Sequence, residues 1–177
     1  MIENINLKLK ETENQLIYYA KKISILRKNK ALELEKEVKY ILNQMYLQQV
    51  QFKFDFQIND FNDNGIDNVK IVVSTNSGQP LQPLQKIASG GELSRIMLAI
   101  KAVSQNSKDG GTIIFVEADT GVSGKVAESI GHVMKKISKK QQVVCITHLA
   151  QVACFANNHL FIEKEQMDNT SKVHVRL

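Results

Sequence analysis

A pair of glycines at the start of an amphipathic segment is the most specific chemical pattern in the sequence. The pattern consists of Ser89, Gly90, Gly91 and Glu92, and apolar residues with helical spacing follow it over 93–103. Glycine lets the backbone approach a ligand closely, and the first turn of a helix presents unpaired N–H groups and a positive dipole end. The pattern is typical of a phosphate-binding loop, although an ordinary loop with a serine cap before a helix would use the same residues.

Two carboxylates follow a predicted buried strand. Residues 112–116, TIIFV, form a continuous apolar run that predicts a strand buried on both faces, and Glu117 and Asp119 come directly after it. Ligands of α/β proteins bind at the carboxyl ends of such strands, where a glutamate can polarise a water for attack on a phosphoryl group. The alternative is an acidic loop that caps the next helix through Asp119 or Ser123.

One histidine stands in an equivalent position. His148 follows a second apolar strand predicted over 142–147, and a neutral imidazole there can donate to a phosphate oxygen or to the attacking water. Taken by itself, a histidine at a strand end is more often structural. The other histidines lack such a position, and we interpret His132, His159 and His174 as structural or surface residues.

Together, the glycine pattern, the carboxylates and His148 indicate nucleotide hydrolysis at one edge of a sheet. The sequence contains no GxxxxGK[ST] motif, so no Walker A loop is present to hold the β- and γ-phosphates. We therefore expect that this chain alone does not bind ATP in the usual P-loop manner.

The N-terminal quarter of the chain predicts a long helix. Residues 1–47 contain neither glycine nor proline, and apolar residues repeat in heptads at Leu9, Leu16, Ile23, Tyr19 and Leu26. A wider apolar set covers residues 34–45, as in a helix that leaves a coiled coil and docks on a globular body. The alternative is one amphipathic helix packed on its own domain throughout.

The remaining elements alternate between strands and helices. Residues 50–58 and 69–75 predict an antiparallel hairpin around a polar turn at Gly65, with the alternating apolar residues of 50–58 on one face. A loop over 76–86 follows, and further on come a helix over 125–138, a short helix over 149–155, and strands over 159–165 and 172–177. Apolar strands separated by helices predict a parallel α/β layer.

Composition limits the class of protein. The chain has 177 residues, 43% of them hydrophobic, and a net charge of +5, which suits one domain with an appendage and does not establish a nucleic-acid partner. No apolar run is long enough for a membrane span, and the charged start is not a secretory signal. Cys145 and Cys154 predict free thiols rather than a disulfide or zinc site. We interpret the lysine cluster at 135–140 as a solvated helix edge in preference to a phosphate-binding patch.

Four segments resemble the C-terminal part of the RecN family of bacterial DNA repair proteins, which are SMC-like ATPases of the ABC class. The segments are KIASGGELSRIMLAIK, EADTGVSGKVAESI, VVCITHLAQVACFANNHLFIEK and STNSGQPLQPL. The likeness runs from about Ile23 to the end of the chain. The string ASGGE fits many ABC ATPases, whereas DTGVSG together with CITHLAQVA is similar to RecN specifically.

The resemblance implies a fold, a division of the chain and a role for each site residue. The fold is the α/β C-terminal lobe of an ABC/SMC-type ATPase head over 48–177, preceded by a coiled-coil arm and docking helix over 1–47. Glu117 would be the catalytic glutamate, and His148 the switch histidine near the γ-phosphate. Asp119 would be the D-loop aspartate that communicates across a dimer of heads. The signature, which would contact ATP held by the opposite head, corresponds to Ser89, Gly90, Gly91 and Glu92.

One residue departs from the family pattern. An aspartate that orients Mg²⁺ on the ATP phosphates normally precedes the catalytic glutamate, and this chain has Val116 there. Loss of such a carboxylate reduces turnover by orders of magnitude. Mg²⁺ binding is therefore in doubt, and no metal ligand is assigned to this chain.

The resemblance implies an ATPase head that acts in recombinational repair of DNA double-strand breaks, with ATP sandwiched between two heads. The expected partners are the Walker A lobe of the same head, a second head in a homodimer, and DNA, and the expected location is the cytoplasm at the nucleoid. We expect a fragment that is inactive alone, since the Walker A half is absent. The rival hypotheses are a catalytically inactive, nucleotide-gated interaction or DNA-tethering module, and an SMC or ABC protein outside DNA repair.

Overall fold

The computed structural model describes residues 2–87, 89–104, 111–122, 124–167 and 170–177. The chain forms two compact units, Met1–Leu93 and Ser94–Leu177. The division into an arm over 1–47 and a lobe over 48–177 stays a prediction.

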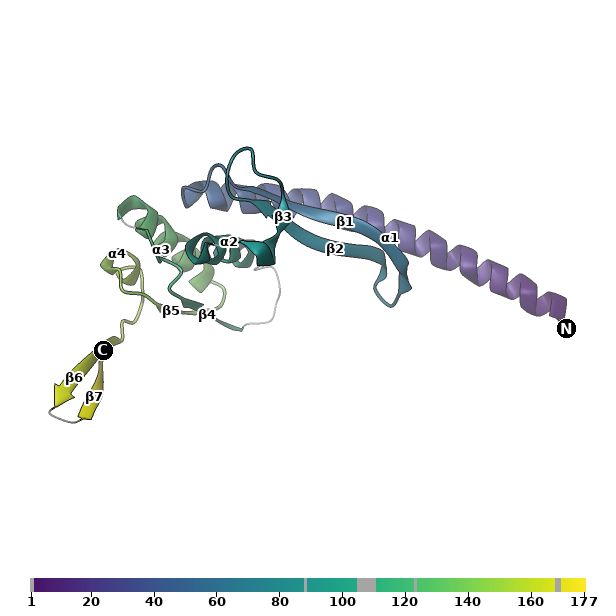
Figure 1. Ribbon diagram of the computed structural model, residues 1–177. Helices are drawn as coiled ribbons and strands as arrows, with labels where there is room; N and C mark the ends of the chain where they lie inside the picture. Colours follow the sequence, from purple (N-terminus) through teal and green to yellow (C-terminus); the bar gives the residue numbers. More distant parts are fainter. Residues whose placement is uncertain (1, 88, 105–110, 123, 168–169) are drawn as a thin grey trace. The chain divides into compact units, whose positions relative to one another are not determined.

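The first unit is built on the long helix α1 (Ile2–Gln44), which lies along the hairpin of β1 (Gln51–Asn62) and β2 (Gly65–Ser74), as Figure 1 shows. Every residue from Ile2 to Tyr19 is exposed, and the helix begins to bury side chains only at Ala20. The described residues therefore leave the heptad residues uncovered, which favours a coiled-coil arm over a helix packed on its own domain throughout. The wider apolar set docks as predicted, with Val38, Ile41, Leu42 and Met45 all buried.

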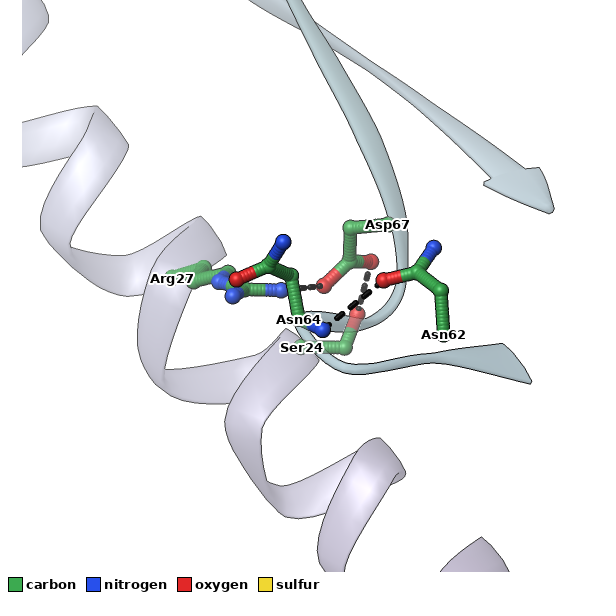
Figure 2. A network of polar contacts seen from close by, with 5 residues as sticks. All are labelled: Ser24, Arg27, Asn62, Asn64 and Asp67. Atoms are coloured by element: carbon green, nitrogen blue, oxygen red, sulfur yellow. Dashed lines mark hydrogen bonds and ion pairs between the residues drawn. The ribbon is translucent and has the colours of Figure 1, made fainter. Parts of the chain in front are cut away.

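A polar cluster connects the hairpin to α1 shortly after the point where the helix starts to bury side chains (Figure 2). The buried Asp67 carboxylate accepts a hydrogen bond from the Ser24 hydroxyl at 2.7 Å, and its other oxygen pairs with Arg27 at 3.2 Å. At the turn, the Asn64 N–H donates to the Asn62 side chain at 2.8 Å. Both oxygens of Asp67 are thus satisfied by residues one helical turn apart on α1.

The hairpin strands are longer than the sequence predicted. The polar stretch over 59–67 was expected to be a turn, but β1 continues to Asn62 and β2 starts at Gly65, which has a φ of 100°. Because α1 holds Asp67, polar residues near the tip stay in the ladder. The alternating apolar residues of β1 become more exposed towards the turn of the hairpin. Phe52 is buried, whereas Ile58 is 78% exposed. A two-residue strand, β3 (Gln82–Pro83), and a 3₁₀ turn (Leu84–Lys86) interrupt the predicted loop.

Helix α2 (Gly90–Val103) forms where the apolar spacing predicted it. Its buried face differs in detail from the prediction, because Ile96, Leu98 and Ala99 are fully buried whereas Met97 is exposed. The helix begins directly after Ser89, so the glycine pattern occupies its first turn.

The second unit is a parallel strand pair with helices. Strands β4 (Thr112–Val116) and β5 (Gln142–Ile146) pair in register, with Val116 opposite Ile146, and α3 (Gly124–Ser138) connects them and packs on β5. The short helix α4 (Ala150–Ala153) follows β5 and lies against α3, where Phe155 occupies the space that a side chain on Gly131 would need.

The prediction that β4 and β5 are buried on both faces is wrong. Phe115 alternates with Ile114 and Val116 along β4 and is buried on one face of the strand pair. On the opposite face, four apolar side chains are exposed: Ile114, Val116, Val144 and Ile146. The apolar pattern of these strands is that of a sheet with two covered faces, and the described residues cover only one.

The parallel layer forms from β4 and β5, but the strand predicted over 159–165 does not join it. Strand β6 (Phe161–Met167) pairs with β7 (Thr170–Arg176) as a separate antiparallel hairpin, drawn in yellow in Figure 1, and not with β5. Among the described residues, no helix has both the length and the apolar character of a membrane span.

Candidate functional site

Ser89 is the N-cap of α2. The Glu92 N–H donates to the Ser89 hydroxyl oxygen at 3.4 Å, and the Leu93 N–H donates to the Ser89 carbonyl at 3.0 Å. This is the capping arrangement considered as the alternative to phosphate binding, and it leaves the Ser89 hydroxyl proton free to be donated. Ser89 and Gly90 are exposed. Among the described residues, apart from the chain neighbours of Gly90 and the backbone of its own helix, no atom lies within 4 Å of the point where a Cβ on Gly90 would stand. The helix start is therefore open to a ligand.

Glu117 extends the strand pairing by one residue and then turns sharply. Its N–H donates to the Ile146 carbonyl at 3.0 Å, and its own carbonyl accepts from the backbone N–H and the hydroxyl of Thr120 at 3.1 and 2.8 Å. Its φ is 51°, a left-handed conformation that residues other than glycine rarely adopt. The side chain is exposed. Strained residues of this kind occur at functional sites when the surroundings hold them in place.

Asp119 lies inside the unit, with 1% of its surface exposed. Its Oδ2 accepts a short hydrogen bond from the hydroxyl of Thr147, and the same hydroxyl oxygen accepts from the Leu149 N–H at 3.0 Å. Its other oxygen, Oδ1, is buried with no hydrogen-bond partner among the described residues. Ser123, the other residue considered as a cap for the next helix, lies outside the described residues.

His148 lies between Thr147 and Leu149, so the Thr147–Leu149 hydrogen bond closes a turn around it. Its side chain is exposed, as is that of Glu117. Because β4 and β5 are parallel and in register, Glu117, Asp119 and His148 all follow strand ends at the same edge of the sheet. The structure thus brings these three residues to one edge in the second unit, whereas Ser89, Gly90, Gly91 and Glu92 belong to the first unit.

Burial and the negative charge of Asp119 raise the pKa of the Cys145 thiol to about 11. Cys145 is consequently a protonated thiol at neutral pH, as expected for an unreactive cysteine. Sequence reasoning missed Thr147, which is the partner of Asp119. Its only signal was a hydroxyl residue directly before His148 at a strand end.

Val116 lies on the exposed face of β4, with 59% of its surface exposed, and offers no ligand atom. Among the described residues, no group of three or more histidines, cysteines, aspartates or glutamates could hold a metal ion. The residues at this edge therefore do not fit a metal site formed by this chain alone.

The lysine cluster and the remaining histidines behave as ordinary surface groups. Lys135 donates to the Asn157 side chain at 2.7 Å, and the cluster sits at the C-terminal end of α3, where positive charge is favourable. His132 contacts the Phe155 ring with centroids 4.4 Å apart, and the His174 ring lies 3.1 Å from Glu165 across the β6–β7 hairpin.

Comparison with known proteins relates the chain to one family over its whole length. The DNA repair protein RecN of Bacillus subtilis is 38% identical over 191 residues, which span 99% of this chain and 33% of that protein. RecN of Rickettsia conorii is 39% identical over 178 residues, again with 99% of this chain and 33% of the relative. The chain belongs to the RecN family. It spans about a third of the length of these RecN relatives. No protein-family model matches the chain.

Solved structures agree with the fold. The SMC head domain with a coiled coil and joint from Pyrococcus yayanosii superposes with a TM-score of 0.59 at 19% identity, over 94% of this RecN-family chain and 32% of that chain. The SMC head domain with an extended coiled coil from Pyrococcus furiosus, bound to the C-terminal domain of ScpA, gives a TM-score of 0.58 at 19% identity, over 85% and 36%. The chain therefore has the mixed α/β fold of an SMC ATPase head, preceded by a long helix of the coiled-coil type.

Proposed function

We propose that this chain is the C-terminal lobe of an SMC-like ATPase head that acts in recombinational repair of DNA double-strand breaks. The observation that carries the proposal is the edge of the β4–β5 pair, where Glu117, Asp119 and His148 follow parallel strand ends in a chain related to RecN along its length. The protein would work in the cytoplasm at the nucleoid. ATP would be sandwiched between two heads, each of which supplies part of the site.

The start of α2 would contact the γ-phosphate of ATP held by the opposite head. Ser89 keeps a hydroxyl proton to donate, Gly90 leaves open space for close approach, and the helix start carries positive potential. Gly91 and Glu92 complete the proposed signature. ATP thus fits the residues present at this helix start, although the phosphate loop itself would come from the Walker A lobe.

Glu117 would orient and deprotonate the attacking water. Three hydrogen bonds hold the backbone of Glu117 in place. The position from which its exposed side chain extends is therefore fixed at the strand end. His148, exposed at the end of β5, would donate to the γ-phosphate as charge develops in the transition state. Attack of the water on the γ-phosphorus would break its bond to the β–γ bridging oxygen, so that ADP leaves and inorganic phosphate forms. The two heads would then separate.

The exposed face of β4 and β5 supports the Walker A lobe as a partner. Ile114, Val116, Val144 and Ile146 form an apolar surface that the described residues leave uncovered. A lobe of the same head would cover it, and a second head would join through ATP. A solved structure from work on ATP-driven dimerization and DNA-stimulated activation of SMC ATPases superposes on this chain with a TM-score of 0.51. DNA contacts are not assigned to individual residues.

A second function is favoured by Val116. With no carboxylate before Glu117, the head would bind ATP but hydrolyse it slowly, and the chain would serve as a nucleotide-gated interaction or DNA-tethering module. Val116 is exposed among the described residues, so an aspartate there leaves the packing within this lobe unchanged. The pair Val116 and Val116→Asp therefore separates the two functions.

The first experiment measures engagement of two heads. This chain is co-expressed with the Walker A lobe of a relative, and the lifetime of the ATP-bound dimer is compared for the parent and Glu117→Gln in the Val116→Asp background. Loss of the base should prolong the dimer lifetime by about 100-fold or more, since general base catalysis contributes on this scale. An unchanged lifetime at saturating ATP would remove Glu117 from the catalytic role.

The chain without its Walker A lobe gives a second readout. The apolar face of β4 and β5 should drive self-association at high concentration, measurable by sedimentation. Val144→Lys, which places a charge on the exposed face, should shift the chain towards monomer. Monomeric sedimentation of the parent chain at high concentration would contradict this use of the face.

A further inference from the structure

The Asp119 carboxylate joins the ends of β4 and β5 from inside the second unit. Oδ2 accepts the Thr147 hydroxyl proton, and the Thr147 oxygen in turn accepts from the Leu149 N–H at 3.0 Å. One buried carboxylate therefore reaches the loop after β4, the end of β5 and the start of the segment that leads into α4.

The two residues proposed to do chemistry flank this connection. Glu117 is two residues before Asp119, and its N–H bonds to the Ile146 carbonyl, the residue before Thr147. The segment 117–119 is thus tied to the end of β5 at both of its ends. On the other strand, the hydrogen bond from Leu149 to Thr147 spans His148 and closes a turn around it.

We propose that Asp119 is a positioning residue that acts through Thr147 to fix the backbones of Glu117 and His148 for hydrolysis. The inference rests on the proposed function and assigns Asp119 a role inside its own lobe. A carboxylate with 1% of its surface exposed, bonded to a neighbouring strand, is placed to hold this edge together.

A carboxylate suits this position because it only accepts hydrogen bonds. It directs the single proton of Thr147 towards β4 and leaves a lone pair of the hydroxyl for the Leu149 N–H. An amide could instead donate to the Thr147 oxygen, in competition with Leu149. Asp119 therefore selects one arrangement of the turn that carries His148.

Two features near Asp119 are unfavourable for the stability of the fold. Oδ1 of Asp119 is buried without a partner among the described residues, and a buried, unpaired acceptor is unfavourable. Glu117 adds a left-handed φ of 51° two residues away. Strained and unpaired groups collected at one strand edge are typical of a functional site held by its surroundings.

Hydrogen exchange of the Leu149 amide in this chain tests the connection without ATP. Thr147→Val removes the hydroxyl and keeps the side-chain shape, so exchange should become about tenfold faster. Thr147→Ser keeps the hydroxyl and should restore protection. Ser138→Ala removes a hydroxyl that bonds only within α3 and serves as a matched control. Unchanged exchange in Thr147→Val would overturn the proposal.

ATP turnover tests the functional part, in the reconstituted head with Val116→Asp. Thr147→Val and Asp119→Asn should lower kcat by about 10- to 100-fold, as misplacement of catalytic groups does, with little change in KM for ATP. Thr147→Ser should recover most of the turnover. Unchanged kcat in a head whose Leu149 exchange has risen would overturn this inference, whereas absence of turnover in the folded parent head would instead overturn the proposed function.

Discussion

Two buried aspartates, Asp67 and Asp119, differ in how their carboxylate oxygens are hydrogen-bonded. Each joins a segment to a neighbouring element, and each side chain is almost fully buried. Asp67 satisfies both oxygens, one with the Ser24 hydroxyl and one with Arg27, which stays partly in solvent. Asp119 satisfies only one oxygen, through Thr147, and its other oxygen is buried with no partner among the described residues.

The difference distinguishes a structural connection from a functional one. A buried charge with a cation and a hydroxyl as partners is compensated, so the Asp67 cluster stabilises the contact of hairpin and arm. Among the described residues Asp119 has one hydroxyl and no cation as a partner, so we expect its buried charge to contribute less to stability than that of Asp67.

The largest effect on stability should come from Asp67→Asn, compared with Asp119→Asn as a separate variant. Asp67→Asn removes the ion pair with Arg27 and should lower the free energy of unfolding by about 1–2 kcal/mol, a value reduced by the partial exposure of Arg27. Asp119→Asn removes an uncompensated charge and should change it by less than about 0.5 kcal/mol.

Urea unfolding followed by hydrogen exchange measures each unit separately, because the two units need not unfold together. Asp60→Asn, at an exposed carboxylate of the same hairpin, is the control. Equal losses for Asp67→Asn and Asp119→Asn would remove the distinction between the two residues.

A smaller effect concerns the thiol beside Asp119. Burial is the larger cause of the raised Cys145 pKa and the Asp119 charge the smaller, so Asp119→Asn should lower the pKa from about 11 without restoring the ordinary value. A lower pKa means more thiolate at pH 8, and each half unit makes alkylation about threefold faster.

Alkylation of Cys145 is measured in a Cys154→Ser background, with Asp67→Asn as the matched control in the other unit. The control should leave the rate unchanged. An equal alkylation rate in the parent and in Asp119→Asn would mean that the carboxylate charge does not affect the pKa of the Cys145 thiol.

Another comparison concerns two non-glycine residues with a left-handed backbone, Tyr46 with a φ of 60° and Glu117 with a φ of 51°. Glycine at either position relieves strain but gives the unfolded chain more freedom, so Tyr46→Gly and Glu117→Gly should each stabilise by no more than about 1 kcal/mol. Thermal unfolding measures both. Only Glu117→Gly should also abolish turnover, and loss of stability in both variants would contradict the strain at these positions.

Local pattern was enough to predict most elements. Helix α1 forms where the absence of glycine and proline predicted it, and α2 and α3 form where apolar spacing predicted them. The order of β4, α3 and β5 brings Glu117 and His148 to one edge. The assignment to RecN and the SMC-head fold is confirmed by the relatives and solved structures.

Long-range pairing was beyond the sequence. The strand after α4 joins β7 instead of β5, and nothing in its own residues specified that choice. The exposure of Ile114 and Val144 depends on what the rest of the chain covers, not on the strands. The bond from Thr147 to Asp119 links residues 28 positions apart, and no local pattern encodes it. The roles of the individual site residues stay predictions.

The most direct test of the central claim is ATP turnover by the reconstituted head, with Val116 and with Val116→Asp. The account predicts slow turnover with Val116 and an increase of about 100-fold or more with aspartate, since a metal-orienting carboxylate stabilises the transition state on this scale. No turnover in either form of a head that is folded and binds ATP would contradict the claim that this chain carries the catalytic edge of an ATPase.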